Sequence, residues 1–149
     1  AWFFTDGQGA EQALDIYRET FQPTEQYPKP HAALCVWALA SSTNKEAQFH
    51  YSSRVKWRLF RERGIFLPIE PPDLAAAHEF TGVEKDRIRK DRADAFVGTG
   101  EKVANQIQSL AIRHDIEEIA IVTWAHDEKI RRESYELLAK AFDLSFVEQ

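Results

Sequence analysis

The chain has 149 residues and a mass of 17.2 kDa, the size of one domain that buries roughly 70% of its unfolded surface. Its 19 Lys and Arg residues against 24 Asp and Glu residues give a net charge of −5, which argues against a protein that tracks nucleic-acid phosphates. Hydrophobic residues make up 44% and charged residues 29%, proportions that exclude a disordered chain and a membrane bundle. The longest apolar run, Ala32 to Ala40, is far shorter than the ~20 residues of a membrane-spanning helix. Together with a single cysteine, Cys35, which suits a reducing compartment, this predicts a cytoplasmic protein with no membrane and no nucleic-acid partner.

The first part of the chain is predicted to contain two strands separated by a helix. Trp2 to Phe4 precedes a glycine-containing turn and favours a short buried strand. Residues 10–21 carry apolar side chains at helical spacing and predict an amphipathic helix, which the following prolines end. Residues 31–40 are apolar on both faces, which is typical of a strand covered on both sides.

A long helical insertion is predicted after this second strand. Thr43 and Glu46 form a capping box that begins one helix, and Gly64 is suited to end it. A short helix follows from Asp73. Thr81 then begins a highly charged helix, whose side chains we expect to face solvent and to pair at i,i+4 spacing.

The C-terminal part is predicted to contain a helix, a strand and a closing helix. The brief apolar segment 95–99 leads into a helix capped by Thr99. Glu118 to Trp124 favours a third strand, and Asp127 caps the last helix. This alternation of strands and helices predicts an α/β fold with a parallel sheet. Three strand–helix units cannot close an eight-stranded barrel of roughly 250 residues, so the chain forms either a small open sheet or part of a larger barrel.

A candidate site follows from position, because the sequence contains no P-loop, dinucleotide, zinc-protease or serine-hydrolase motif. We predict no metal site and assign no catalytic residue. Ligands of parallel α/β folds bind at the carboxyl ends of the strands, where this sequence places Phe4, Thr5, Trp37, Thr123 and Trp124. Two interpretations stay open at this point: ordinary core aromatics, or an aromatic-walled pocket suited to a planar ring.

Three blocks of the sequence, in this order, resemble the C-terminal half of the bacterial-luciferase-like, flavin-dependent monooxygenases. The first covers residues 3–47 and contains an aromatic strand, a short loop and the segment LDIYRETFQP. The second is FVGTGEKVANQI at residues 96–107. The third covers residues 118–142 and has the pattern R-x-x-S-Y-x-L-L. No block alone is a catalytic signature, but their order and spacing together are specific.

This resemblance implies a TIM (β/α)8 barrel of which residues 1–149 supply about the last three βα units, with a helical insertion. The N-terminal half, absent here, would carry most flavin phosphate contacts and the usual catalytic histidine. By position, Phe4, Thr5, Trp37, Thr123 and Trp124 would line the flavin and substrate cavity. The implied activity uses O₂ and reduced FMN, supplied by a separate NAD(P)H flavin reductase, on a small organic substrate in a dry aromatic site.

Two alternatives stay open beside this activity. One is a deazaflavin-dependent oxidoreductase of the same fold that transfers a hydride, and the other is a non-catalytic fragment or assembly protein. We also expect the chain to self-associate or to pair with its own N-terminal half, because the strand near Phe3 and the last strand would be open edges. Their inward side chains would form a bare apolar patch that includes Phe4, Cys35, Trp37 and Ile121.

Overall fold

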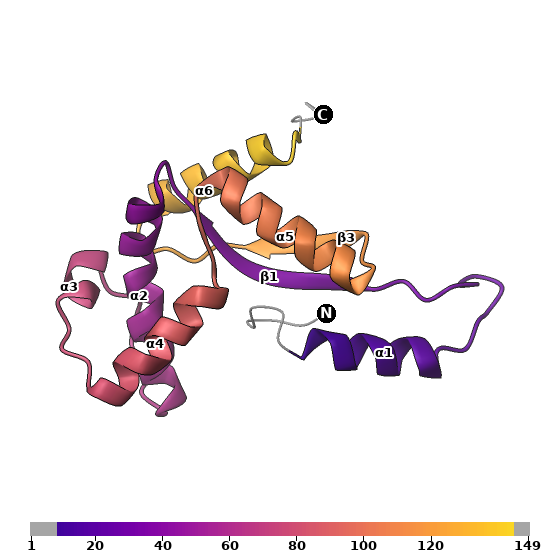
Figure 1. Ribbon diagram of the computed structural model, residues 1–149, viewed down its shortest axis with the longest axis horizontal. Helices are drawn as coiled ribbons and strands as arrows, with labels where there is room; N and C mark the ends of the chain where they lie inside the picture. Colours follow the sequence, from indigo (N-terminus) through magenta and orange to yellow (C-terminus); the bar gives the residue numbers. More distant parts are fainter. Residues whose placement is uncertain (1–8, 145–149) are drawn as a thin grey trace.

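The computed structural model describes residues 9–144, in which six helices and three strands are found (Figure 1). In chain order they are α1 (Ala10–Thr20), β1 (Ala33–Ala40), α2 (Asn44–Glu62), α3 (Pro72–Ala76), α4 (Gly82–Asp94), β2 (Phe96–Gly98), α5 (Gly100–His114), β3 (Glu118–Val122) and α6 (Glu128–Ala141). The strand predicted at residues 2–4, with Phe4 and Thr5, lies outside the described residues.

The three strands form one parallel sheet in the order β2–β1–β3. The first half of β1 pairs with β3, from Ala33 opposite Glu118 to Trp37 opposite Val122. The last three residues of β1 pair with β2 on the other side. The predicted α/β class and parallel sheet are therefore confirmed. β2 was not predicted as a strand, because three residues are too few to show a strand periodicity.

Successive side chains of β1 enter two different cores, because they point to opposite faces of the sheet. One core lies against α1, α5 and α6 and contains Leu14, Leu34, Val36, Ala38, Ala40, Phe96, Val103, Ile107, Leu110, Ile116 and Leu138. The other lies against α2 and contains Trp37, Leu39, Ala47, Tyr51, Val55, Leu59, Ala95 and Val97. Both faces of β1 are covered, as its unbroken apolar sequence predicted.

The expectation of a bare inward patch is wrong where the structure describes it. Trp37 is 3% exposed and Cys35 is 8% exposed. Trp37 is covered because α2 turns back over this face and stacks Tyr51 on the indole ring. Ile121 is half-buried and packs against the core on the other face of the sheet. The helical insertion therefore closes part of the surface that the strands alone would leave open.

The helices begin where local chemistry predicts. Thr43, Thr81, Thr99 and Asp127 each accept a hydrogen bond from a backbone N–H of the first helical turn. Gly64 follows α2 with a φ of 78°, in the left-handed region that favours glycine after a helix end. These caps fix the helix boundaries, and through them the position of each strand end.

Helices α2, α3 and α4 form a group beyond the carboxyl end of β1 (Figure 1). The predicted i,i+4 pairing of α4 is present between Arg87 and Asp91, at 3.9 Å. The prediction of a merely solvated helix was incomplete, because α4 also reaches α2 and the residue after it. These contacts join Glu84 to Arg63, Arg87 to Glu62, and Arg92 to Gln48. Ionic and polar contacts hold the two helices together.

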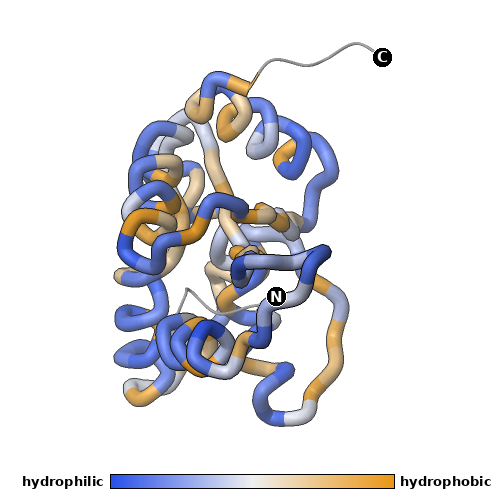
Figure 2. The backbone as a smooth tube through the Cα atoms, turned by 90° about the vertical axis from the view of Figure 1, so that its right-hand side faces the viewer, coloured by the Kyte–Doolittle hydropathy of each residue, from blue (hydrophilic) through white to orange (hydrophobic). Residues whose placement is uncertain are grey.

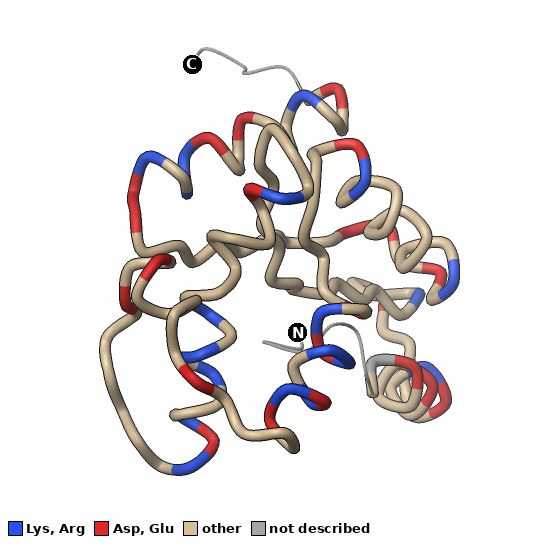
Figure 3. Tube along the Cα trace, turned by 60° about the vertical axis from the view of Figure 1, so that its left-hand side comes forward, with Lys and Arg blue, Asp and Glu red and all other residues tan. Residues whose placement is uncertain are grey.

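Charged and hydrophobic residues are distributed differently over the helices and the strands. The helices mix hydrophilic and hydrophobic turns (Figure 2), and charged residues of both signs concentrate on them (Figure 3). The strands carry one charged residue, Glu118, among residues 9–144. No helix within those residues combines the length and the apolar character that crossing a membrane requires.

Candidate functional site

Aromatic side chains from β1, from α2 and from the residue that follows Thr123 meet around one arginine. The guanidinium carbon of Arg54 lies 4.3 Å from the ring centre of Trp37 and 5.4 Å from that of Trp124. Trp37 stacks on Tyr51, with ring centres 5.3 Å apart, and Trp124 meets Trp57 edge-on at 5.5 Å. We call these five residues the aromatic–arginine cluster: Trp37, Tyr51, Arg54, Trp57 and Trp124.

α2 places three members of this cluster by its helical spacing. Tyr51, Arg54 and Trp57 follow one another at intervals of three residues, so neighbouring members lie on adjacent parts of one helix face. Arg54 is 4% exposed, which is uncommon for an arginine. The faces of two indole rings attract its positive charge, and this attraction strengthens when water is excluded. The helix therefore brings a buried cation to the ends of the strands.

A cavity of 310 Å³ adjoins the cluster, which is enough volume for a small ligand. It is lined by Arg54, Trp57, Arg58, Arg61, Glu62 and Trp124. Every lining residue except Trp124 comes from α2. The cavity thus combines aromatic surfaces with several guanidinium groups, an arrangement that can hold a planar ring and a negative charge.

Thr123 and its neighbours tie the strand ends together. The Thr123 hydroxyl donates a hydrogen bond to the carbonyl of Ala38 at 2.8 Å, and its backbone N–H donates to the Tyr135 hydroxyl at 2.9 Å. On β1, the backbone N–H of Ala40 donates to the hydroxyl of Ser134 at 2.9 Å. Tyr135 and Ser134 of α6 therefore satisfy backbone donors at the carboxyl ends of both strands.

The structure brings some of the five predicted cofactor-binding residues together. Trp37 and Trp124 both lie against the Arg54 guanidinium, and Thr123 precedes Trp124 and donates a hydrogen bond to β1. Trp124 lines the cavity, whereas Trp37 does not and instead stacks on Tyr51. Phe4 and Thr5 lie outside the described residues. Cofactor binding by these residues stays a prediction.

Arg54 and Arg61 were not predicted as site residues. A signal for Arg54 was present, because it lies three residues after Tyr51 and next to Val55, on the apolar stripe of the predicted helix. A charged residue on such a stripe indicates a polar function or a specific partner. Arg61 lies at the exposed end of the same helix, where an arginine is common and carries no signal.

Two buried polar groups near the sheet bear on its chemistry. The indole N–H of Trp37 has no hydrogen-bond partner among residues 9–144, although buried donors are normally paired. Burial raises the pKa of the Cys35 thiol, which keeps it protonated and poorly nucleophilic. Within the part of the chain that the structure describes, no three His, Cys, Asp or Glu side chains gather as metal ligands would.

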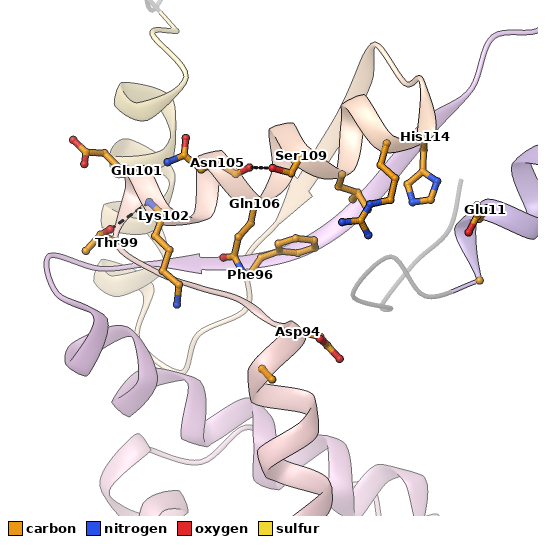
Figure 4. Close-up of a pocket in the computed structure, with 14 residues that line it drawn as sticks. Glu11, Asp94, Phe96, Thr99, Glu101, Lys102, Asn105, Gln106, Ser109 and His114 are labelled. Carbon is orange, nitrogen blue, oxygen red and sulfur yellow. Dashed lines mark hydrogen bonds between the residues drawn. The ribbon is translucent and has the colours of Figure 1, made fainter.

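A larger cavity of 930 Å³ lies along α5, away from the cluster (Figure 4). Its lining mixes charges of both signs, with Glu11 and Asp94 facing the same hollow as Lys102 and Arg113. Phe96 is its aromatic contributor, and the cavity shares no lining residue with the aromatic–arginine cluster. We place the candidate site at the cluster, because the 310 Å³ cavity beside it lies at the strand ends. That cavity combines aromatic faces with an excess of positive charge.

Comparisons with known proteins support the resemblance seen in the sequence. No family model matches the chain. Protein YwcH of Bacillus subtilis (strain 168) is 30% identical over 140 residues, which is 93% of this chain and 42% of the relative. Protein YceB of the same organism is 28% identical over 139 residues, again 93% and 42%. A luciferase-like monooxygenase of Escherichia coli (strain K12) is 28% identical over 126 residues, which is 85% of this chain and 38% of the relative.

A solved structure shares the fold. The crystal structure of apo-MsnO8 matches 93% of this chain and 42% of its own, with a TM-score of 0.78 and 29% sequence identity. The chain therefore spans about two fifths of the length of the proteins it matches. These similarities support a relationship to luciferase-like monooxygenases.

Proposed function

We propose that the chain forms the C-terminal part of a luciferase-like, flavin-dependent monooxygenase. In this proposal O₂ and FMN, reduced by a separate NAD(P)H flavin reductase, act on a small organic substrate. The similarity to the E. coli luciferase-like monooxygenase supports the class of enzyme. The parallel sheet, and the match of this chain to 42% of the apo-MsnO8 chain, support a partial barrel.

The aromatic–arginine cluster is the observation that carries the proposal. Trp124 offers an aromatic wall to the 310 Å³ cavity, and Arg54 offers a positive charge with N–H donors. These groups fit one side of a planar ring that carries hydrogen-bond acceptors. In the complete protein Trp124 would pack against the flavin, while Trp37 and Thr123 would shape the wall behind it.

The cofactor would supply the redox chemistry when bound. The residues of this chain would orient the ring and exclude water, which aromatic side chains do because they offer few hydrogen-bonding groups. Phe4 and Thr5, at the carboxyl end of the strand predicted at residues 2–4, would add to the same wall. The other units of the barrel would supply the remaining contacts, including those to the phosphate.

The test is the Trp124→Ala variant of the intact protein. Loss of the aromatic wall should weaken FMN binding or release more hydrogen peroxide per NADH oxidised, while the melting temperature falls only modestly because Trp124 is half-buried. Phe49→Ala, which removes an exposed ring of α2 outside the cluster, is the matched control and should leave coupling unchanged. A Trp124→Ala variant that loses several kcal/mol of stability but stays coupled would identify Trp124 as core packing instead.

The same assay separates the two alternatives. Turnover with a deazaflavin cofactor but not with FMN would replace the monooxygenase by a hydride-transfer enzyme. An intact protein that binds neither cofactor would favour the assembly protein.

A further inference from the structure

We propose that the end of α2 forms a subsite for the carboxylate of a small planar substrate, with Arg61 as its anchor. The subsite consists of Trp57, Arg61 and Trp124, three of the residues that line the 310 Å³ cavity. This inference rests on the proposed function, because it names the class of substrate that the same site would take: an aromatic carboxylate.

The charge of the cavity favours an anion. Arg54, Arg58 and Arg61 line it together with one acid, Glu62, although the whole chain carries a net charge of −5. Glu62 already lies 3.4 Å from Arg58 and 2.8 Å from Arg87, so two neighbouring cations share its charge. The local field is thus opposite in sign to that of the molecule and attracts a negatively charged ligand into this cavity.

Ring contacts preorganise the Arg61 guanidinium for such a ligand. Its guanidinium carbon lies 5.1 Å from the ring centre of Trp57 and 5.2 Å from that of Phe66. Within residues 9–144 these ring contacts are not accompanied by an ion pair of Arg61. Aromatic contacts restrict a guanidinium without using its N–H groups, which stay available for a two-pronged hydrogen bond to a carboxylate. Less conformational freedom is then lost when the ligand binds.

The two tryptophans favour a planar substrate. Trp57 and Trp124 meet at an angle of 85°, with ring centres 5.5 Å apart, and form an aromatic corner beside Arg61. A ring that enters this corner can stack on one indole and meet the edge of the other, which are the two favourable geometries for aromatic pairs. The cavity volume of 310 Å³ is at the lower limit for small-molecule sites and suits a single-ring acid.

The experiment compares benzoate with benzamide, its neutral counterpart of similar shape, by isothermal titration of the intact protein. Benzoate should bind about tenfold more tightly than benzamide, and added salt should weaken the binding of benzoate alone. Arg61→Gln should remove the difference between the two probes. Arg61→Lys should retain part of it, because an ammonium keeps the charge but not the planar fork. Benzenesulfonate should bind as benzoate does if the anion is what Arg61 recognises.

Two further variants complete the design. Arg89→Gln removes an exposed arginine of α4 that pairs with Asp86, and should leave the affinity for benzoate unchanged. Phe66→Ala leaves Arg61 in place but removes one of its ring contacts, so it should weaken benzoate binding less than Arg61→Gln. This variant keeps the test valid if Arg61→Gln disturbs the end of α2, which circular dichroism would reveal.

Any of four results overturns the proposal. The wild type binds benzoate and benzamide equally well, or it binds neither probe at millimolar concentration. Arg61→Gln binds benzoate as tightly as the wild type, or Arg89→Gln loses as much benzoate affinity as Arg61→Gln. FMN binding is measured separately by its absorbance. Arg61-dependent binding of benzoate in a protein that does not bind FMN would retain the anion subsite and reject the flavin enzyme. FMN binding by a protein that does not discriminate between benzoate and benzamide would retain the flavin enzyme and reject the anion subsite.

Discussion

Ser134 shows how one hydroxyl can complete a strand. It is fully buried and accepts the hydrogen bond of the Ala40 backbone N–H, a donor that no neighbouring strand satisfies within the described residues. We expect Ser134→Ala to lower the free energy of unfolding by about 1–3 kcal/mol, because it leaves that buried donor unpaired. Urea unfolding measures the change. Ser109→Ala, which removes an exposed hydroxyl bonded to the Asn105 carbonyl, should cost less than about 0.5 kcal/mol. Equal losses in the two variants would refute this role of Ser134.

Glu84 makes the stability of the insertion depend on pH. The backbone N–H of Thr81, at 2.7 Å, and the Thr81 hydroxyl, at 2.8 Å, donate to its carboxylate, and Arg63 lies beside it. These contacts, the backbone hydrogen bond above all, lower the pKa of Glu84. A lowered pKa in the folded state means that the stabilisation is present at neutral pH and is lost as the pH falls through that value.

Melting temperatures measured between neutral pH and below the ordinary glutamate pKa of about 4.3 test this dependence. The melting temperature of Glu84→Gln should fall less steeply than that of the wild type over this acidic range, because the glutamine cannot be protonated there. Thr81→Ala should give an intermediate slope, because it removes the hydroxyl but keeps the backbone donor. If the melting temperatures of the wild type and Glu84→Gln fall in parallel with pH, other carboxylates control the loss of stability in acid.

At the scale of elements, a glycine at the start of α5 lies directly against the backbone of α6. A Cβ added to Gly100 would lie 2.7 Å from the carbonyl oxygen of Leu137, which is backbone and cannot move aside easily. We expect Gly100→Ala to destabilise the chain by about 1–3 kcal/mol through overpacking.

Gly82 provides a matched control for that variant. It is the first residue of α4 as Gly100 is of α5, but a Cβ there would meet nothing within 4 Å. Gly82→Ala should be neutral, or stabilising by up to about 1 kcal/mol, because alanine restricts the unfolded chain more than glycine does. Thermal or urea unfolding of the two variants measures the contrast. If both variants behave alike, the glycine of α5 is not required by the packing of α6.

The elements also show which features a sequence reveals. Thr43, Thr81, Thr99 and Asp127 act within one helical turn, so their caps could be predicted from neighbouring residues alone. β2 could not be predicted, because a three-residue strand exists only through its pairing with β1. The position of Trp37 beneath Tyr51 likewise depends on the path of α2, which local periodicity does not specify.

The candidate site was predictable in part for the same reason. The rule that ligands bind at the carboxyl ends of parallel strands identified Trp37 and Trp124. The structure brings both residues to the same arginine. That arginine comes from α2, inside an insertion that the rule does not consider. Contacts between distant segments, such as Arg54 with Trp124, are tertiary, and a single sequence carries only an indirect signal of them.

At the scale of the whole molecule, the sheet remains exposed along β3. All five residues of β3 are exposed or half-buried, whereas β1 is buried almost throughout. β3 also pairs on one side only within the described residues. An unpaired strand edge is a template for another chain. We propose that the chain associates with a second copy, or with its own N-terminal half, across this edge.

Light scattering of the purified chain at micromolar concentration tests this association, and we expect a species larger than the monomer. Ala120→Lys places a charge at an exposed position of β3 and should shift the chain towards the monomer. Ala77→Lys, an exposed position after α3, is the control and should leave the size unchanged. A well-dispersed wild-type monomer would instead indicate a self-contained α/β domain.

The gathering of tryptophans around Arg54 has an optical consequence. Three of the four tryptophans of the chain, Trp37, Trp57 and Trp124, lie in the aromatic–arginine cluster. A positive charge next to an indole ring changes the energy of its excited state, so the intrinsic emission of this protein reports mainly on one small region. Far-ultraviolet circular dichroism reports on the helices instead. If the emission changes at a lower urea concentration than the dichroism, the contact between α2 and the end of β3 opens while the helices are still folded, and the site is then the least stable part of the molecule.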